Sequence, residues 1–315
     1  MHWTYLMLES LSQTFIALIQ TVVEPFTFIS NPGKRVYWGF LLSSAVLAYI
    51  VLRLQQQHIK YQIRTLFSRD VWLTPSSIID VQWLFINHTL RATLILPLIG
   101  GQIGFALATN SLLESLFDKG NFIDWPPLYI SLLFTVCVFI VDDFTRFLVH
   151  FLYHKVPMLW RFHAIHHSAD ILTPLTLYRI HFIESLINTC RSLVALGFVS
   201  GVFVYTFQGQ ITTIDILGIS LFSMIFNLAG ANLRHSSIWV SFGRFEKLFI
   251  SPAQHQMHHS QAPQHHNINY GACLAIWDRL FASWQPSHIQ PQKICYGIKG
   301  YRNEGILKQL FGINA

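Results

Sequence analysis

The stretch HFLYHKVPMLWRFHAIHHS, residues 150–168, places five histidines in a chain that is otherwise largely apolar. His150 and His154 are four residues apart, so on a helix they lie on one face about one turn from each other. The motif HAIHH, residues 163–167, has histidines at positions i, i+3 and i+4, which also share one helical face. This stretch therefore predicts helices that each present several imidazoles on one side.

A second set of histidines lies further along the chain and repeats the pattern. The motif HQMHH covers residues 255–259, and the motif NLRH ends at His235. Together with the first stretch they supply nine histidines. Neutral imidazole suits iron, copper, zinc and nickel, and it adds no charge to a buried site. Because a structural zinc ion takes about four ligands, nine histidines predict two metal ions with higher coordination numbers.

The composition indicates a membrane protein. Hydrophobic residues make up 52% of the 315 residues and charged residues only 11%, whereas soluble proteins carry about 25% charged residues. The net charge is +6, but no run of Lys and Arg is longer than two residues. We therefore expect the basic residues to flank membrane segments and expect no nucleic-acid partner.

Five apolar stretches approach the roughly 20 residues that span a bilayer. We expect an all-α, polytopic membrane protein with about five transmembrane helices. Residues 4–29 are apolar at helical spacing but too broken to span, and we interpret them as an interfacial helix. The expected spans are residues 36–54, 89–108, 126–141 (continuing helically towards His150), 182–207 and 211–228.

The distribution of Lys and Arg predicts which side of the membrane carries the histidines. The segments 53–88, 146–181 and 230–315 hold most of these residues, whereas the opposite side receives only Lys34, Arg35 and Lys119. The positive-inside rule then places the histidines in the cytoplasm, and we expect a bacterial inner-membrane protein. The expected units are residues 1–135 (interfacial helix and first spans), 136–285 (the domain that carries the histidine motifs) and 286–315 (a tail outside the bundle).

The ordered motifs HFLYH, HAIHHS, NLRH and HQMHHS, followed by NYG and WDRLF, resemble the fatty acid hydroxylase/sterol desaturase superfamily of membrane-bound di-iron oxygenases. The resemblance covers residues 136–284, nearly half of the chain. It implies transmembrane helices under a cytosolic cap, and a histidine cage that holds two iron ions, with O2 as co-substrate. The implied metal ligands are His150, His154, His163, His166, His167, His255, His258 and His259, with His235 joining them.

Further positions match the family less closely. The segment LTLYRIHFIES, residues 175–185, resembles the family's RxHPxE motif, with Phe182 in place of the proline. His181 is either a tenth ligand or a hydrogen-bond partner of Glu184. Asp143 either orients a metal-bound imidazole, as carboxylates near metal sites do, or is a charge at a helix end. Glu184, Asn269 and Asp278 are expected to support the ligands in the same indirect way, and no catalytic residue beyond the ligands is expected.

The resemblance implies an O2-dependent oxidoreductase that hydroxylates or desaturates a membrane lipid, such as a fatty acyl chain or a sterol. Zinc can replace the iron in purified protein. Because the chain has no flavin or nicotinamide fingerprint, electrons are expected from a ferredoxin, a cytochrome b5-like protein or a reductase. Two alternatives stay open: a non-catalytic membrane zinc protein, either transporter or sensor, and a membrane haem protein. The sequence does not fix the lipid or the choice between hydroxylation and desaturation.

Overall fold

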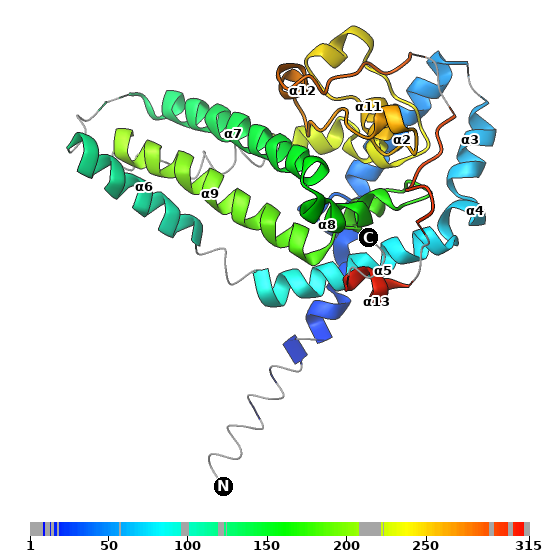
Figure 1. Cartoon of the computed structure of the whole chain (residues 1–315), viewed down its shortest axis with the longest axis horizontal. Helices are drawn as coiled ribbons and strands as arrows, with labels where there is room; N and C mark the ends of the chain where they lie inside the picture. The colour runs from blue at the N-terminus through cyan, green and yellow to red at the C-terminus, as the bar shows by residue number, and fades with distance from the viewer. Residues whose placement is uncertain are drawn as a thin grey trace.

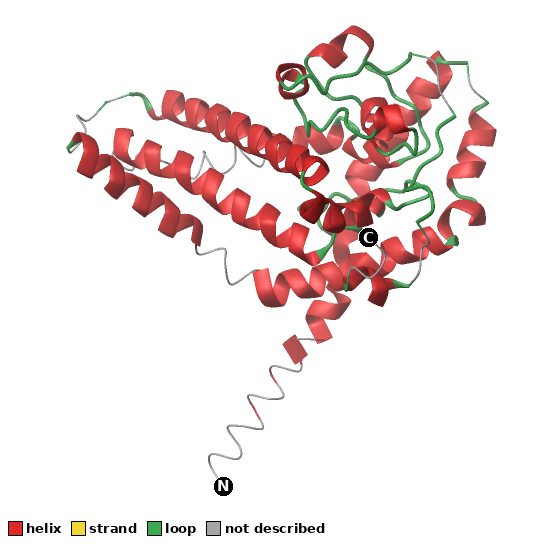
Figure 2. Ribbon diagram, in the orientation of Figure 1, coloured by secondary structure: helices red, strands yellow, loops and turns green. Residues whose placement is uncertain are grey.

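The computed structural model describes residues 9, 13, 16–17, 19–56, 58–95, 101–118, 123, 125–207, 222, 224–289, 293–301 and 305–311. Among these residues the regular structure is helical, with two isolated β-bridges and no strand (Figure 2). The expected all-α class is confirmed. Residues 4–8, 10–12, 14–15 and 18 of the expected interfacial helix, and most of the span 211–228, lie outside the described residues.

Helices α6, α7 and α9 form a lobe that extends away from the rest of the molecule (Figure 1). The core between α7 and α9 contains Phe134 from the first and Phe203 from the second, with ring centroids 5.1 Å apart. Gly201 of α9 allows α6 to approach closely, because a Cβ atom there would lie 2.5 Å from the carbonyl oxygen of Ala106. The helices span Gly101–Phe117 (α6), Pro127–Lys155 (α7) and Phe182–Phe207 (α9).

The remaining helices surround the C-terminal end of α7 (Figure 1). Most are short and are joined by loops, so the histidine-bearing part of the chain is compact and irregular. The π-helix η2 directly follows α5 and leads towards α6. The bounds are η1 Glu24–Ser30, α2 Trp38–Leu54, α3 Ile59–Leu66, α4 Arg69–Trp72, α5 Pro75–Leu90, η2 Arg91–Ile95, α8 Pro157–His167, η4 Thr176–Tyr178, η5 Ala231–His235, η6 Gly243–Lys247, α11 Pro252–His258, η7 Pro263–His265, α12 Ile276–Leu280 and α13 Ile306–Leu310.

The outer surface of the lobe is apolar. No residue of α6 is buried, and its exposed side chains include Ile103, Leu112 and Leu116. Helix α9 is the one helix of the described residues that is long and apolar enough to cross a membrane, and α2 is a shorter apolar helix. Five membrane-spanning helices are therefore not confirmed. Of the expected span 89–108, residues 89–95 and 101–108 are helical, and residues 96–100 lie outside the described residues.

Helix α2 packs along the segment that contains His235. Its residue Leu52 lies in a buried cluster with Ile238, and Gln55, just after the helix, donates a hydrogen bond to the carbonyl of Trp239 (3.1 Å). At the other end, Asn232 donates to the carbonyl of Arg35 (2.9 Å). The residues that flank α2 on both sides thus contact one short segment, residues 232–239. The expected topology put Arg35 and this segment on opposite sides of a membrane.

The C-terminal residues also differ from the expected tail outside the bundle. Gln309 of α13 accepts a hydrogen bond from the indole of Trp83 (2.7 Å). The carbonyl of Cys295 accepts a hydrogen bond from the backbone N–H of Gln261 (2.9 Å). The carbonyl of His288 accepts one from the indole of Trp239 (2.7 Å). Residues beyond 286 therefore pack against earlier parts of the chain, through one side chain and two backbone carbonyls that accept hydrogen bonds.

A buried ion pair fixes the end of helix α8. Arg179 and Asp80 are fully buried and lie 3.3 Å apart. The same guanidinium donates to the carbonyl of Ile165 (3.0 Å) and to the hydroxyl of Ser168 (2.7 Å), at the C-terminal end of α8. Thr176 donates to the other carboxylate oxygen (2.6 Å). This network joins α5 to the helix that carries three of the histidines.

Replacing Asp80 by Asn leaves the Arg179 guanidinium buried without its counter-charge. Breaking a buried pair costs about 3–5 kcal/mol, so D80N should lower the free energy of unfolding in detergent by several kcal/mol. The exposed Asp70→Asn is the matched control and should change it by less than about 0.5 kcal/mol. The double variant Asp80→Ala/Arg179→Met should lose less than the sum of its two single variants. An effect of D80N as small as that of D70N would contradict this role.

Candidate metal centre

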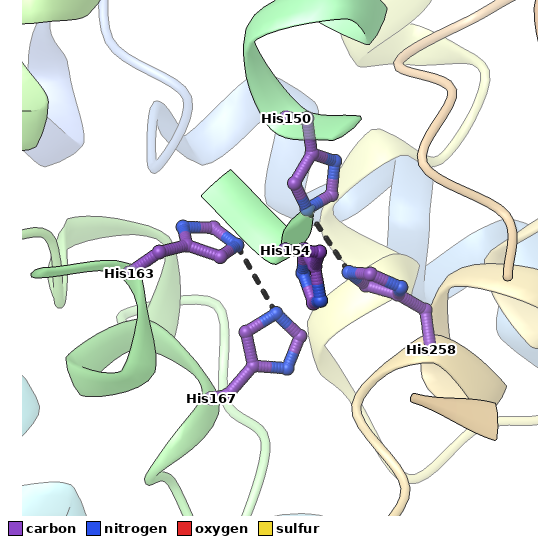
Figure 3. Close-up of side chains that lie close together, drawn as sticks. All are labelled: His150, His154, His163, His167 and His258. Carbon is purple, nitrogen blue, oxygen red and sulfur yellow. Dashed lines mark hydrogen bonds between the residues drawn. The ribbon is translucent and has the colours of Figure 1, made fainter. Parts of the chain in front are cut away.

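Nine histidine side chains gather into two groups in the interior. In each group the nitrogen atoms that face one another lie within 4.8 Å. Figure 3 shows the first group, in which rings from different parts of the chain point towards a common centre. The first group is His150, His154, His163, His167 and His258, and the second group is His166, His235, His255 and His259.

The two HxxHH motifs divide their histidines between the groups. Helix α8 supplies the first and last histidines of its motif to the first group and His166 to the second. The motif at α11 does the reverse, because His258 joins the first group, and His255 and His259 join the second. The groups adjoin, since the ring centroids of His167 and His259 lie 4.5 Å apart. Helical spacing therefore builds two neighbouring sites from two short motifs.

The Nε2 atoms face one another at short distances. In the first group, Nε2 of His150 lies 3.0 Å from Nε2 of His258, and the same atoms of His163 and His167 lie 3.1 Å apart. In the second group, Nε2 of His255 lies 3.1 Å from that of His235 and 3.2 Å from that of His259.

Backbone carbonyls bind the opposite nitrogens of two of these rings. Nδ1 of His150 lies 2.7 Å from the carbonyl oxygen of Tyr270, and Nδ1 of His258 lies 2.7 Å from that of Ile268. A carbonyl can only accept, so each Nδ1 carries the proton. Each neutral ring then presents a bare lone pair at Nε2, and the two lone pairs face one another.

Two further rings have the same kind of support. Nδ1 of His163 donates to the carboxylate of Glu184 (3.0 Å), and both side chains are buried. Nδ1 of His166 lies 3.3 Å from the carbonyl of Arg179. Such hydrogen bonds fix the tautomer and the orientation of metal-binding histidines.

These contacts fit metal ions at both groups. Facing lone pairs repel unless a cation lies between them, and burial disfavours a proton as that cation: it lowers the pKa of His163 to about 3 and that of His166 to about 4. His154 adds a buried Nε2 atom that has no hydrogen-bond partner. Nitrogen donors of this kind suit iron, zinc or copper. The predicted meeting of both HxxHH motifs therefore has the geometry that a metal centre needs.

His181 lies outside both groups. Its Nε2 donates to the carbonyl of Leu310 (3.1 Å), and its Nδ1 accepts from the backbone N–H of Ile183 (3.1 Å). Both ring nitrogens therefore have partners that hold the C-terminal helix and the start of α9. We do not retain His181 as a tenth ligand.

Asp143 supports the centre less directly than expected. Its carboxylate accepts from the backbone N–H groups of Cys273 (2.9 Å) and Leu274 (3.0 Å) and from the indole of Trp277 (2.9 Å). It accepts from none of the imidazoles of the described residues. It is neither an imidazole partner nor a simple helix-end charge, because it joins α7 to the segment that precedes α12.

Asp278 and Asn269 act on the same segment. Asp278 accepts from the N–H groups of Tyr270 (2.8 Å) and Gly271 (2.7 Å), and Asn269 exchanges two hydrogen bonds with the backbone of Gln285 (2.8 and 3.0 Å). This segment carries the carbonyls of Ile268 and Tyr270, which hold the rings of His258 and His150. The supporting carbonyls were missed by sequence reasoning, because every residue has one and no residue type marks it.

A cavity of about 450 Å³ reaches the first group from the surface. His154, His167 and His258 form part of its wall, and Lys155 and Lys299 line it as well. Small molecules therefore have a route to the first group that does not require the helices to separate.

Comparisons with known proteins agree with the motifs. Residues 135–283 match the family model described as fatty acid hydroxylase. The chain is 28% identical to the ornithine lipid hydroxylase OlsE of Rhizobium tropici over 187 residues, which are 59% of this chain and 52% of the relative. It is 26% identical to the alkylglycerol monooxygenase of Xenopus tropicalis and 22% identical to that of Homo sapiens, each over 160 residues, 51% of this chain and 32% of the relative.

The chain thus spans about half the length, or less, of these curated relatives. No solved structure matches. The residues matched by the family model are those that carry the histidine motifs, and the relatives are lipid hydroxylases and monooxygenases. Residues 135–283 of the chain therefore match the fatty acid hydroxylase family.

Proposed function

We propose that this protein is an O2-dependent oxidoreductase that hydroxylates or desaturates a membrane lipid at a histidine-ligated di-iron centre. The observation that carries the proposal is the pair of buried histidine groups whose Nε2 atoms face one another at 3.0–3.2 Å. The names of the relatives support a lipid substrate.

The first group would hold one ion and the second group the other. Five nitrogens surround the first position and four surround the second, so ions with six-coordinate geometry would keep positions open. Two bound iron ions would supply the redox chemistry that activates O2 towards an unactivated C–H bond. The nitrogen donors also suit zinc, which explains how zinc could replace iron during purification.

The residues of this chain orient the ligands and control access to them. The carbonyls of Ile268 and Tyr270 and the carboxylate of Glu184 fix the ring orientations. Burial keeps the rings neutral. Electrons would come from a separate ferredoxin, cytochrome b5-like protein or reductase, and Lys155 and Lys299 give the accessible cavity a positive mouth that suits an acidic carrier.

We place the lobe of α6, α7 and α9 in the membrane and the histidine groups at its boundary. The apolar outer surface of the lobe supports this position, and α7 carries His150 and His154 at the end that leaves the lobe. The cytoplasmic side of a bacterial inner membrane is favoured because most Lys and Arg residues lie in the loops on that side of the lobe.

The alternatives differ in how well they suit the centre. A haem requires space for a porphyrin between two axial histidines, whereas four or five imidazoles converge here within 4.8 Å. A non-catalytic zinc protein would use the same nitrogen donors. Activity with iron, O2 and a reductant separates it from the oxidoreductase.

Removal of one ligand from each group should remove one metal ion at a time. His167→Ala and His259→Ala should each lower the summed iron and zinc content from about two to about one ion per chain, because each group loses a donor that the others cannot replace. Elemental analysis of purified protein measures this content. The controls His288→Ala and His181→Ala should retain both ions. A loss in H181A with none in H259A would contradict the ligand assignment.

The metal-free protein should lose stability as the pH falls. The pKa values of His163 and His166 drop from 6.5 to about 3 and about 4 on folding, so between pH 6.5 and pH 4 the unfolded chain binds more protons than the folded chain. The free energy of unfolding should therefore fall with falling pH, by about 1.4 kcal/mol per pH unit for each histidine. The exposed His58→Gln is the control and should keep the slope. A flat profile in detergent over this range would contradict neutral, buried rings.

The function itself is tested by comparing the lipids of cells that lack the gene, express the protein, or express His166→Ala. An oxygenated or unsaturated lipid should appear with the wild-type protein and with His58→Ala, and should be absent with H166A. Mass spectrometry identifies the lipid and the change. Equal lipid profiles in all these cells, with the protein metal-loaded, would favour the non-catalytic zinc alternative.

A further inference from the structure

A second cavity lies between η1, α5, η4 and the start of α9, and the family comparisons assign it no role. Its volume is about 530 Å³. We call it the basic pocket, because its wall contains the basic side chains of Lys34, Arg35, His88 and Arg91, with Glu24 as the single carboxylate among its lining residues.

The carboxylate in the basic pocket is already paired. Glu24 lies 2.9 Å from Nε2 of His88 and 3.8 Å from Nζ of Lys34. Among the described residues, no carboxylate lies within ion-pair distance of Arg35 or Arg91. The basic pocket therefore has uncompensated positive charge.

The position of Arg35 makes this imbalance costly. Its guanidinium packs over the ring of Phe226 at 5.6 Å, and the buried guanidinium of Arg234 packs over the same ring at 4.9 Å. Burial and the nearby Arg234 charge lower the pKa of Arg35 to about 10. A charge in such surroundings is normally balanced by a partner of opposite sign.

Two buried polar atoms of the pocket lining have no partner. One is the Nε donor of Arg35, and the other is Oδ1 of Asn87, an acceptor. The amide nitrogen of Asn87 is held by the carbonyls of Tyr178 (2.8 Å) and Ile180, so Oδ1 cannot turn away. The pocket thus offers donors for an anionic oxygen and one fixed acceptor for a hydroxyl or ammonium group.

The basic pocket adjoins both the membrane lobe and the metal centre. Arg91 begins the π-helical turn that leads to α6, and Ser185 lies in the first turn of α9. Tyr178 and Ile180 line the pocket, and the carbonyl of Arg179, which lies between them, accepts a hydrogen bond from His166. An amphiphile held here would have its polar end at the membrane boundary. Its binding site would be one residue away from the Arg179 carbonyl that holds the ring of His166.

We propose that the basic pocket binds the anionic headgroup of the lipid substrate, with Arg35 and Arg91 on the carboxylate or phosphate and Asn87 on a neighbouring donor. This inference rests on the proposed function, because it assigns the headgroup of the lipid that the metal centre would oxidise. Phe28 and Leu84, which also line the pocket, provide apolar contacts for the first carbons of the chain.

The test compares amphiphiles that differ only in charge. Purified, metal-loaded protein in a nonionic detergent is offered a lysophosphatidic acid, an N-acylglycine and a monoacylglycerol of equal chain length, and bound lipid is quantified by native mass spectrometry. The wild-type protein should prefer at least one anionic amphiphile over the monoacylglycerol by about tenfold or more, because each lost charge-assisted hydrogen bond costs about tenfold in affinity. Arg35→Gln and Arg91→Gln should each reduce this preference about tenfold, whereas Arg53→Gln, remote from the pocket, should keep it.

A matched pair at Ala92 guards against variants that fail to fold. Ala92 lines the pocket, so Ala92→Glu would place a carboxylate beside the arginines and abolish the preference, whereas Ala92→Gln has the same size and should retain it. Equal binding of charged and uncharged amphiphiles by the wild-type protein, or equal behaviour of A92E and A92Q, overturns the proposal. Competition by excess inorganic phosphate as strong as that of the amphiphile also overturns it, since the pocket would then hold a soluble anion.

The two proposals fail in different ways. If cells form no modified lipid but the charge preference and its loss in A92E are found, the oxidoreductase proposal fails and the headgroup pocket stands. If modified lipid forms and the wild-type protein has no charge preference, the pocket assignment fails and the proposed function stands.

Discussion

The whole arrangement depends on imidazole nitrogens that face one another across 3.0–3.2 Å in a buried interior. Rings whose Nδ1 protons bind carbonyls have only lone pairs to offer at Nε2, so close packing of these rings is unfavourable without a cation. Burial makes protonation a poor solution, whereas metal ions satisfy several lone pairs at once. Metal ions bound at the two groups would therefore contribute directly to the stability of the histidine-bearing part of the chain.

The scaffold around the centre fixes these rings from behind. The segment 268–274 supplies two carbonyls, from Ile268 and Tyr270, and it is held in turn by Asp143 on α7 and by Asp278. The Arg179–Asp80 pair holds the end of α8 and also positions the carbonyl that binds His166. Asp143 and Asp278 thus act through backbone N–H groups, whereas Glu184 accepts directly from the ring of His163.

The sequence was sufficient to predict the features that depend on helical spacing. The pattern HxxHH places its histidines on one face of a helix, and the predicted all-α class and meeting of the two motifs agree with the structure. Features that depend on contacts between distant segments could not be predicted. His181 binds a carbonyl of the C-terminal helix rather than joining a group, and Arg35 lies beside the segment of His235 although hydropathy and charge placed it across the membrane. Hydropathy describes how apolar a helix is, and it does not reveal whether the apolar side chains meet lipid or, as in α2, another part of the protein.

The most direct measurement of the central claim is an experimental structure of the iron-loaded protein with anomalous scattering recorded at the iron edge. The account predicts two separate iron positions, one among the nitrogens of His150, His154, His163, His167 and His258 and the other among those of His166, His235, His255 and His259. A single metal position, or ions held by carboxylates or cysteines in place of these imidazoles, would contradict it.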